Sequence, residues 1–513
     1  MQNNNMEFEH IPQEKFEFAQ FDAKIHDKKF DTKTRSFFAD ALLRFKKNKS
    51  SVIAAYILLF LILYTIIAPA ISPYEIADKD PMYINSPPFV QSIAEKGWGI
   101  LDGGVVMDSQ NDAQVNFWKG IGVETGYDPI IDILGSTETT VKIRGKETVV
   151  KSYALEVNKY YSIGVMYKTL SYDEFADIQR FQNETGIQVI FPYVEPDAIK
   201  GITDNANIWY EVKDNKGTAK LDDNGNFVPV YSTNKEIEGA EYNSIRVPGD
   251  DGSYIYSIRK SGAVSCRISY YNYYQYLNGT EPFYIFGTNS LGQDLFNAIG
   301  IGARFSLLFA LFVSAINLSI GAVYGAIQGY YGGTIDLVLD RIADVLSGVP
   351  FTVVTILFQL HLAQKVGTAG SFLFAFVLTG WIGMSGLTRK QFYRFKSQEF
   401  VFAARTLGAS DKRLMFKHIF PNALGTIITS CALTIPSVIS SETSLTYLGI
   451  INLSEVAGTT VGTLMSQGQT SMTTSPHAMF FPAIYFSLLM ISFNLFGNGL
   501  RDAFNPSTRG VED

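Results

Sequence analysis

Residues 399–422 read EFVFAARTLGASDKRLMFKHIFPN and separate two long apolar runs. Ala403, Ala404 and Leu407 would share one face of a short helix. Gly408 can end that helix, because glycine adopts the left-handed conformation at little cost. The stretch also carries several Lys and Arg, so it is predicted to connect two membrane-spanning helices at the cytoplasmic surface.

The second half of the stretch predicts a second short helix. Ser410 can cap its start, and Asp411 lies in its first turn, where the helix dipole favours a negative charge. Pro421 can begin the following span, because the first turn of a helix does not need the N–H that proline lacks. The sequence therefore predicts a basic helix–turn–helix, although a plain connector between spans would show the same pattern.

Six apolar runs reach the roughly 20 residues that a helix needs to cross the hydrocarbon core of a bilayer. They lie at 52–71, 305–325, 337–362, 371–387, 423–445 and 479–496. The 513-residue chain is 47% hydrophobic and 18% charged, whereas soluble proteins carry about a quarter charged residues. The predicted fold is an α-helical polytopic membrane protein with six transmembrane helices.

Basic residues are distributed unevenly between the loops. Residues 389–417 carry eight Lys and Arg, whereas residues 450–478 carry none. Such an excess is typical of cytoplasmic loops. With six spans, both termini are predicted to lie in the cytoplasm, and residues 74–286 outside the cell.

The residues between the first two spans are polar and contain short alternating segments. Two hairpin patterns occur, at 139–153 around Gly145 and at 218–231 around an Asp-Asn-Gly turn. A capping-box pattern at Ser171 predicts one helix. We therefore expect a mainly β (α+β) extracellular domain, with the tyrosine-rich residues 270–276 in its sheet core and ligand stacking as their alternative role.

This domain shows no catalytic or metal-binding pattern. It contains no histidine, so it lacks the usual general base and the commonest zinc ligand. The chain has no G-x-x-x-x-G-K-[ST] phosphate loop for ATP and no basic pattern for nucleic acid. Cys266 and Cys431 fall in different regions and are not expected to pair. The chain is expected not to be an enzyme.

Six segments follow from these patterns. They are a cytoplasmic tail (1–34), an amphipathic helix in the membrane interface (35–50), the first transmembrane helix (51–73), the extracellular domain (74–286), a core with the other five spans (287–502) and a cytoplasmic tail (503–513). A solvated helix that leads into the first span is the alternative for residues 35–50.

Several ordered motifs resemble those of one family of transport proteins. The pattern Ala403-Ala404-x-x-x-Gly408, followed by Ile419-x-Pro421, resembles the EAA coupling loop of ABC-importer permeases. Motifs similar to those of the C subunit of oligopeptide and dipeptide permeases lie at 286–294, 302–307, 341–350, 442–449 and 499–506. The resemblance covers about 286–506 and the first span, and the extracellular domain is an insertion in it.

The resemblance implies the type I ABC-importer permease fold, in which the coupling loop (399–422) docks on a cytoplasmic ATPase. The residues expected to serve this coupling are Glu399, Phe402, Ala403, Ala404, Leu407, Gly408, Ala409, Ser410, Asp411, Arg413, Ile419 and Pro421. Phe402 stands where the family has Glu, which removes a charged contact. Asn289 and Gln293 replace Asp and Arg of the motif at 286–294, which removes a possible ion pair.

The resemblance also implies partners and a cargo. The expected partners are a homologous second permease subunit (B-type), two cytoplasmic ATPases that bind ATP and Mg²⁺, an extracellular substrate-binding lipoprotein, and membrane lipid. No cofactor or metal is expected in this chain. The implied function is import of oligopeptides or dipeptides across a bacterial cell membrane by alternating access. The alternatives are import of nickel complexes or another small solute and, from a different class, a membrane-anchored receptor or envelope-assembly factor.

Polar residues inside the predicted spans have two explanations each. Arg341 and Asp344 would form a local ion pair on one helix, or would face the second permease subunit. Glu442 would make a structural hydrogen bond or face a pore, because ionisable groups at membrane depth usually face a bundle interior or a cavity. Ser437 and Ser440 are candidates for the lining of the pore.

Overall fold

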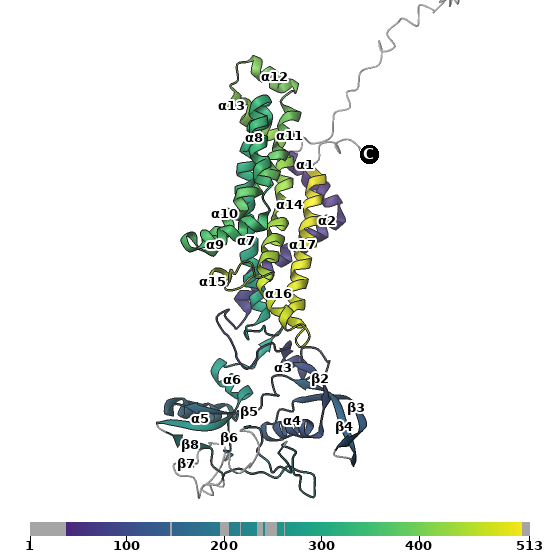
Figure 1. The fold of residues 1–513 in the computed structure, drawn as a ribbon, viewed down its shortest axis with the longest axis vertical. Helices are drawn as coiled ribbons and strands as arrows, with labels where there is room; N and C mark the ends of the chain where they lie inside the picture. The colour runs from purple at the N-terminus through teal and green to yellow at the C-terminus, as the bar shows by residue number, and fades with distance from the viewer. Residues whose placement is uncertain are drawn as a thin grey trace, which may run out of the picture.

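The computed structural model describes residues 37–143, 146–194, 205–215, 217–232, 240–241, 254–260 and 262–504. These residues form a long helical bundle and, beyond one end of it, a region that contains the sheets (Figure 1). The predicted tail at 1–34, most of the tail at 503–513 and the turn at Gly145 lie outside the described residues.

Among the described residues, five helical segments are long and apolar enough to cross a membrane, or up to six if a bent pair counts as one span. The five are α2 (Lys49–Ile71), α7 (Leu295–Tyr331), α10 (Ala363–Gly380) with α11 (Ile382–Phe395), α13 (Asp411–Arg413) with η3 (Leu414–Ile419) and α14 (Phe420–Tyr447), and α17 (His477–Phe504). Between the last two lie the short helices α15 (Ser454–Ala457) and α16 (Val461–Thr470). The predicted helical polytopic fold is confirmed, whereas the number of spans stays a prediction.

The bent pair consists of α8 (Gly333–Ser347) and α9 (Phe351–His361), which meet at an angle of 73°. Pro350 lies at the N-cap of α9 with a ψ of 131°, outside the helical range. Proline has no N–H to donate and disfavours the helical conformation in the residue before it, so the helix stops here. The span predicted at 337–362 is therefore made of two helices that meet at an angle, and its crossing of the membrane stays a prediction.

A row of glycines brings α7 and α11 into close contact. Gly321, Gly325 and Gly329 are spaced four apart, so they share one face of α7. A Cβ added to Gly325 would lie 2.2 Å from the backbone oxygen of Ser385, and one added to Gly329 would lie 2.5 Å from the Cβ of Phe392. Helix backbones approach this closely only where side chains are absent, which is typical of helix pairs in membranes.

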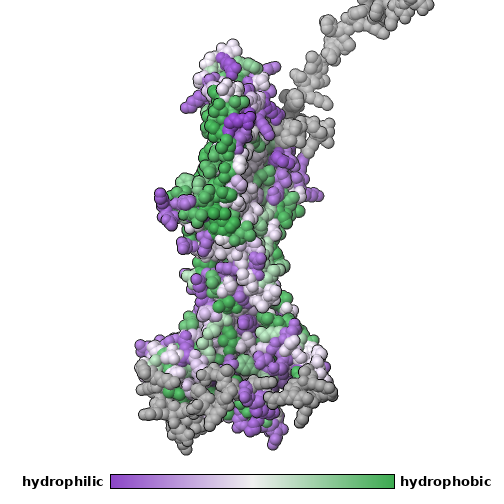
Figure 2. All heavy atoms as spheres, viewed as in Figure 1, coloured by the Kyte–Doolittle hydropathy of each residue, from purple (hydrophilic) through white to green (hydrophobic). Residues whose placement is uncertain are grey.

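The outer surface of the bundle is largely apolar. Phe60, Leu308 and Val345 are each more than half exposed. Figure 2 shows hydrophobic residues gathered over the bundle and hydrophilic residues at its far end and over the sheet region. Soluble monomers rarely expose apolar surfaces of this extent, so this surface fits contact with lipid.

Helix α1 (Phe37–Lys47) occupies the place of the predicted amphipathic helix and packs against α17. The ring of Phe45 meets that of Phe496 edge-on, with centroids 5.5 Å apart. Asn48 separates α1 from α2 and caps α2 by accepting a hydrogen bond from the N–H of Ser51. The position of α1 in the membrane interface stays a prediction.

The described part of the sheet region contains three antiparallel sheets. Its strands are β1 (Phe89–Val90) with β10 (Phe283–Tyr284); β2 (Gly104–Gln110), β4 (Lys146–Asn158) and β3 (Ile130–Ile143); and β5 (Val165–Leu170), β9 (Ala263–Ser269), β8 (Ser257–Lys260) and β7 (Ala240–Glu241), with β6 (Ile190–Phe191) also on β9. Its helices are α3 (Gln91–Ala94), α4 (Asp112–Thr125), α5 (Tyr172–Thr185) and α6 (Tyr270–Asn278). The region is α+β in content, and its location outside the cell stays a prediction.

Strands β1 and β10 hold the two ends of the sheet region together. Phe89 pairs with Tyr284, and Val90 pairs with Phe283. The ring of Tyr74, which follows α2, stacks on that of Tyr284 with centroids 4.6 Å apart. The chain therefore enters and leaves this region at adjacent points.

Two local predictions in this region agree with the structure and a third does so only in part. Strands β3 and β4 form the first predicted hairpin, with Thr139 opposite Val150. Helix α5 begins after Ser171, whose side chain accepts a hydrogen bond from the N–H of Glu174. The second predicted hairpin, at 218–231, contains isolated bridges rather than strands.

The tyrosine-rich residues 270–276 form helix α6, so the prediction of a sheet core there is wrong. The helix side chains from Tyr270 to Tyr274 are all buried. Gly279 ends the helix in the left-handed conformation, with a φ of +68°. Burial on every side of the helix therefore outweighs the preference of tyrosine for strands.

A buried ion pair joins α4 to β9. Arg267 donates two hydrogen bonds to Glu124, of 2.8 and 2.9 Å, and the two side chains are 0% and 2% exposed. Arg267 also donates to the carbonyl of Ala206, and the hydroxyl of Tyr231 donates to Glu124. Burial raises the pKa of Glu124, and the charge of Arg267 opposes that rise. Removal of either partner would leave the other charge buried.

Replacement of Glu124 by Ala should destabilise the sheet region by about 3–5 kcal/mol, because Arg267 would stay buried without a counter-charge. We expect a lower urea midpoint for the full-length protein in detergent, followed by tryptophan fluorescence, since Trp209 donates to the backbone of α4. The control is Lys220→Ala, which removes the exposed pair with Glu211 and should cost less than about 1 kcal/mol. Equal shifts in the two variants would contradict this prediction.

A second substitution tests the contact between α7 and α11. Gly325→Ala should lower the temperature at which the protein in detergent loses its monodisperse peak in size-exclusion chromatography, because the new methyl group would meet the backbone of α11. Gly383→Ala is the matched control, since nothing lies within 4 Å of a Cβ at that helical position. The control should be neutral or slightly stabilising, as for glycine to alanine in an open helix. If Gly325→Ala lowered this temperature no more than Gly383→Ala, the close contact between α7 and α11 would not contribute to the stability of the protein.

Candidate functional site

The coupling segment (residues 399–422) lies at the end of the bundle away from the sheets (Figure 1). It begins with α12 (Glu399–Thr406) and continues into α13. Gly408 makes the turn between them with a φ of +82°. This is the left-handed conformation that the sequence predicts at that position.

The two faces of α12 differ from the prediction. Val401 is fully buried, and Ala404 packs beside it in a cluster that includes Tyr330 of α7. Ala403 and Leu407 are exposed, with 88% of Leu407 accessible. Residues four apart share a helix face, whereas the next residue lies about 100° away. The prediction that Ala404 shares the face of Leu407 is therefore wrong. The apolar residues Val401 and Ala404, three apart, could have predicted the buried face of α12.

The hydroxyl of Tyr330 ties both short helices to α7. It donates a hydrogen bond of 2.5 Å to Asp411, and Arg405 donates to it over 3.5 Å. Ser410 lies at the N-cap of α13, but its side chain makes no cap hydrogen bond there; its carbonyl accepts from the N–H of Leu414. The expected role of the Ser410 side chain as a cap is therefore wrong, and Asp411 binds a neighbouring helix as well as lying in a first turn.

The second helix of the segment does not end before the span. Helix α14 begins at Phe420 with Pro421 in its first turn, as the sequence predicts, although the helical segment runs without a break from Asp411 to Tyr447. Proline has no N–H and its ring clashes with a carbonyl one α-helical turn back. In η3 the turn is wider, and the N–H of Phe420 donates to the carbonyl of Met415, five residues back. This wider turn accommodates the proline inside one helix.

The outer side of the coupling segment carries apolar and basic side chains. We call the exposed residues Phe402, Leu407, Arg413, Phe416 and Lys417 the tip surface. Of the residues predicted for coupling, the exposed ones are Glu399, Phe402, Ala403, Leu407, Gly408, Ser410, Asp411, Arg413 and Pro421, the half-buried ones are Ala404 and Ala409, and the buried one is Ile419. Most of the predicted residues are therefore available to a partner.

An ion-pair cluster joins α8 to α11. Arg389 binds Asp336 at 2.7 Å and Asp340 at 2.6 Å. Arg341 and Asp344 form the local pair at 3.0 Å, and both are largely exposed. Contact of that pair with a second subunit stays a prediction. The sequence analysis did not predict this role of Arg389. Its position as the first basic residue after an apolar run could have indicated an ion pair near the end of a span.

The polar residues of α14 lie in two environments. Glu442 is fully buried and accepts a hydrogen bond of 2.7 Å from Ser306 of α7. Ser437 lines a cavity of about 300 Å³ between α7, α10 and α14. Ser440 and Glu442 do not belong to that lining. The structure therefore places Glu442 in a helix contact and Ser437 at a cavity.

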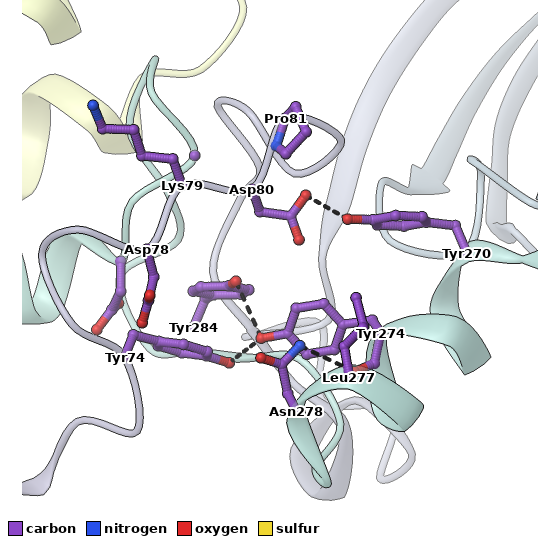
Figure 3. A pocket seen from close by; sticks show the side chains of 12 residues that line it. Tyr74, Asp78, Lys79, Asp80, Pro81, Tyr270, Tyr274, Leu277, Asn278 and Tyr284 are labelled. Atoms are coloured by element: carbon purple, nitrogen blue, oxygen red, sulfur yellow. Dashed lines mark hydrogen bonds between the residues drawn. The ribbon is translucent and has the colours of Figure 1, made fainter. Parts of the chain in front are cut away.

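Another cavity, of about 270 Å³, lies where the sheet region meets the bundle (Figure 3). In its wall Tyr274 donates to the hydroxyl of Tyr74 over 2.8 Å and lies 3.3 Å from the hydroxyl of Tyr284. Tyr270 donates to Asp80 over 2.7 Å. Among the described residues, no group of three or more His, Cys, Asp or Glu could hold a metal ion, in this cavity or elsewhere.

The two substituted residues of the motif at 286–294 bind each other. Asn289 donates from Nδ2 to Oε1 of Gln293 over 2.9 Å. The side chain of Asn289 also accepts from the N–H groups of Leu291 and Gln293. Gln293 donates to the carbonyl of Ile76, which follows α2. A neutral amide pair therefore holds this loop, where the family pattern has two charged residues.

Two known families match this chain. Residues 321–510 match the binding-protein-dependent transport system inner membrane component, and residues 36–88 match the N-terminal TM domain of oligopeptide transport permease C. Residues 89–320, which include most of the sheet region, lie between the two matches.

Several individual proteins are similar to this chain over a little less than half of its length. The oligopeptide transport system permease protein OppC of Bacillus subtilis is 40% identical over 224 residues, which are 44% of this chain and 72% of that protein. The dipeptide transport system permease protein DppC of Bacillus subtilis is 38% identical over 226 residues, 44% and 69% of the two chains. OppC of Escherichia coli is 34% identical over 232 residues, 45% and 74% of the two chains. The chain therefore belongs to the family of oligopeptide and dipeptide transport permease C proteins.

Proposed function

We propose that this chain is the membrane-spanning subunit of an ABC importer that carries oligopeptides or dipeptides by alternating access. Family membership supports the permease role, and the names of the OppC and DppC relatives support a peptide cargo. The observation that carries the proposal is the coupling segment. It leaves Phe402 and Leu407 exposed at one end of the bundle while its inner face is anchored to α7.

The tip surface would dock on one of two cytoplasmic ATPases, which bind ATP and Mg²⁺. Phe402 stands where the family has Glu, so this contact would be apolar at that position. Tyr330 links the segment to α7, and the helix from Asp411 runs without interruption into α14. A displacement of the tip surface by the ATPase would therefore move two helices of the bundle together, as alternating access requires.

We propose an orientation in the membrane from the same arrangement. Helix α1, the coupling segment and the C-terminal end of α17 lie at one end of the bundle, and the sheet region lies beyond the other (Figure 1). The excess of Lys and Arg in residues 389–417 supports a cytoplasmic location for the first end. Both termini would then be cytoplasmic, and the sheet region would face outward. A homologous second permease subunit would complete the pore.

Leu407→Asp should abolish co-purification of the ATPase subunits and peptide uptake, because a charge would replace the most exposed apolar side chain of the tip surface. Desolvating an unpaired carboxylate in an apolar contact is costly. The matched control is Leu448→Asp, which changes another exposed leucine at the opposite end of α14. Normal ATPase association with the Leu407 variant would refute docking at this surface.

We also propose that the sheet region is a docking platform for an extracellular substrate-binding protein. It would lie on the side from which substrate arrives. The β1–β10 pairing holds the two ends of this region together, and Ser475, just before α17, donates to the carbonyl of Asn85 ahead of β1. A partner bound to it would therefore sit at a fixed place relative to the helices.

A replacement of residues 91–282 by an Asn-Gly turn tests this docking. Val90 and Phe283 are antiparallel partners, so a two-residue turn can join them. We expect the affinity for the binding protein to fall at least tenfold, measured by titration of the complex in nanodiscs. Co-purification of the ATPases should persist, which would show an intact bundle. Unchanged affinity would remove the platform role and leave the permease role in place.

A further inference from the structure

The cavity beside Ser437 lies halfway along the bundle. Its walls include Ser314 and Asn317, near the middle of α7, and Thr434 to Ser441, near the middle of α14. Phe351, the first residue of α9, also lines it. The cavity is therefore next to the break between α8 and α9. We call it the mid-bundle cavity, and its volume of about 300 Å³ is near the lower limit for ligand pockets.

Two buried polar atoms of α7 in this lining lack partners. Ser314 is 2% exposed and Asn317 is 7% exposed. Neither the Oγ of Ser314 nor the Oδ1 of Asn317 has a hydrogen-bond partner in the part of the chain that the structure describes. A buried polar group without a partner costs about 1–3 kcal/mol. These two atoms therefore gain free energy if a ligand in the cavity offers them hydrogen bonds.

The side chain of Asn317 is held in place by its surroundings. Its Nδ2 donates a long hydrogen bond to the carbonyl of Phe376 on α10, 3.5 Å away. A Cβ on Gly380 would lie 2.3 Å from that same nitrogen, so the amide rests against a glycine of α10. The oxygen of the amide is the buried end left without a partner, on a residue that lines the mid-bundle cavity.

The rest of the lining is neutral. The polar residues are Ser, Thr and Asn, the others are apolar residues or glycine, and none of the described lining residues is charged. Hydroxyl and carboxamide groups both donate and accept hydrogen bonds, as a peptide unit does with its N–H and C=O. An ammonium or carboxylate terminus would be buried there without a counter-charge, at a high cost. The chemistry of the lining therefore matches main-chain amides and not peptide ends.

We infer that the mid-bundle cavity is a binding subsite for the uncharged main chain of a peptide in transit, with Asn317 accepting a peptide N–H. This inference rests on the proposed import of peptides and adds the residues that contact the cargo. Recognition through the main chain is independent of side-chain identity, because each non-proline residue offers the same N–H and C=O groups. Water in the cavity would also satisfy these atoms, so the test must separate peptide from water.

Two probe peptides make that separation. One is penta-alanine, and the other is the same peptide with N-methyl groups on its three central nitrogens, which removes N–H donors and keeps the carbonyls. Uptake is measured with the complete transporter in proteoliposomes. Asn317→Leu should raise KM for penta-alanine about three- to tenfold, the effect of one neutral hydrogen bond, and should not raise it further for the methylated peptide. Ser319→Ala, at an exposed position of α7, is the control and should change neither value.

Labelling of a cysteine gives a second measurement that does not require transport. Ser437→Cys is introduced together with Cys431→Ala, since the remaining Cys266 is fully buried. Penta-alanine should slow modification of this cysteine by a thiol reagent, and the methylated peptide should do so less. Equal effects of Asn317→Leu on both peptides, or no protection by penta-alanine, would overturn the subsite. A wild-type complex that moves no peptide would instead refute the proposed function.

Discussion

The close contact between α7 and α11 is the constraint on which the other sites depend. Helix α7 runs for 37 residues from the sheet region to the coupling segment, so one rod connects both ends of the molecule. The glycine row lets α11 approach closely enough for Phe392 to join the cluster under Val401. The same approach brings Arg389 to the acids of α8. A change in the packing of α7 against α11 would therefore shift the residues under the coupling segment. It would also shift helix α8, which ends at the break beside the mid-bundle cavity.

The other end of α7 is also held by hydrogen bonds. Asp294 caps the helix by accepting from the N–H groups of Phe296 and Asn297, and it also accepts from Ser72 at the end of α2. The amide pair of Asn289 and Gln293 closes the preceding loop. The N–H of Asn85, which precedes β1, donates to the carbonyl of Asn289 in that loop. Hydrogen bonds therefore join the sheet region to the loop before α7. A partner that displaced the sheet region would therefore displace the start of α7 as well.

Local patterns predicted the features that depend on local chemistry. The apolar runs predicted the helical membrane fold. Gly408 predicted a turn and Ser171 the start of a helix, because both roles depend only on neighbouring backbone atoms. The failures occur where a distant contact decides the outcome. Ala404 faces inward because α7 provides a partner for it, and residues 270–276 form a helix because the surrounding tyrosines bury every side. Arg389 and Asn317 were missed for the same reason, since their partners and the cavity come from other helices.

The pairing of β1 with β10 lets the sheet region close on itself before the later spans are synthesised. The sheet region is one uninterrupted stretch between α2 and α7, so all its strands leave the ribosome before the later spans. Its core includes Tyr284 of β10 and can be complete once that strand has been made. Residues 295–513 then need roughly 10–40 s at about 5–20 residues per second. The region can thus fold outside the membrane while only α2 is inserted. Helix α7 would then assemble onto a finished neighbour, and errors in the bundle would not propagate back into the sheets.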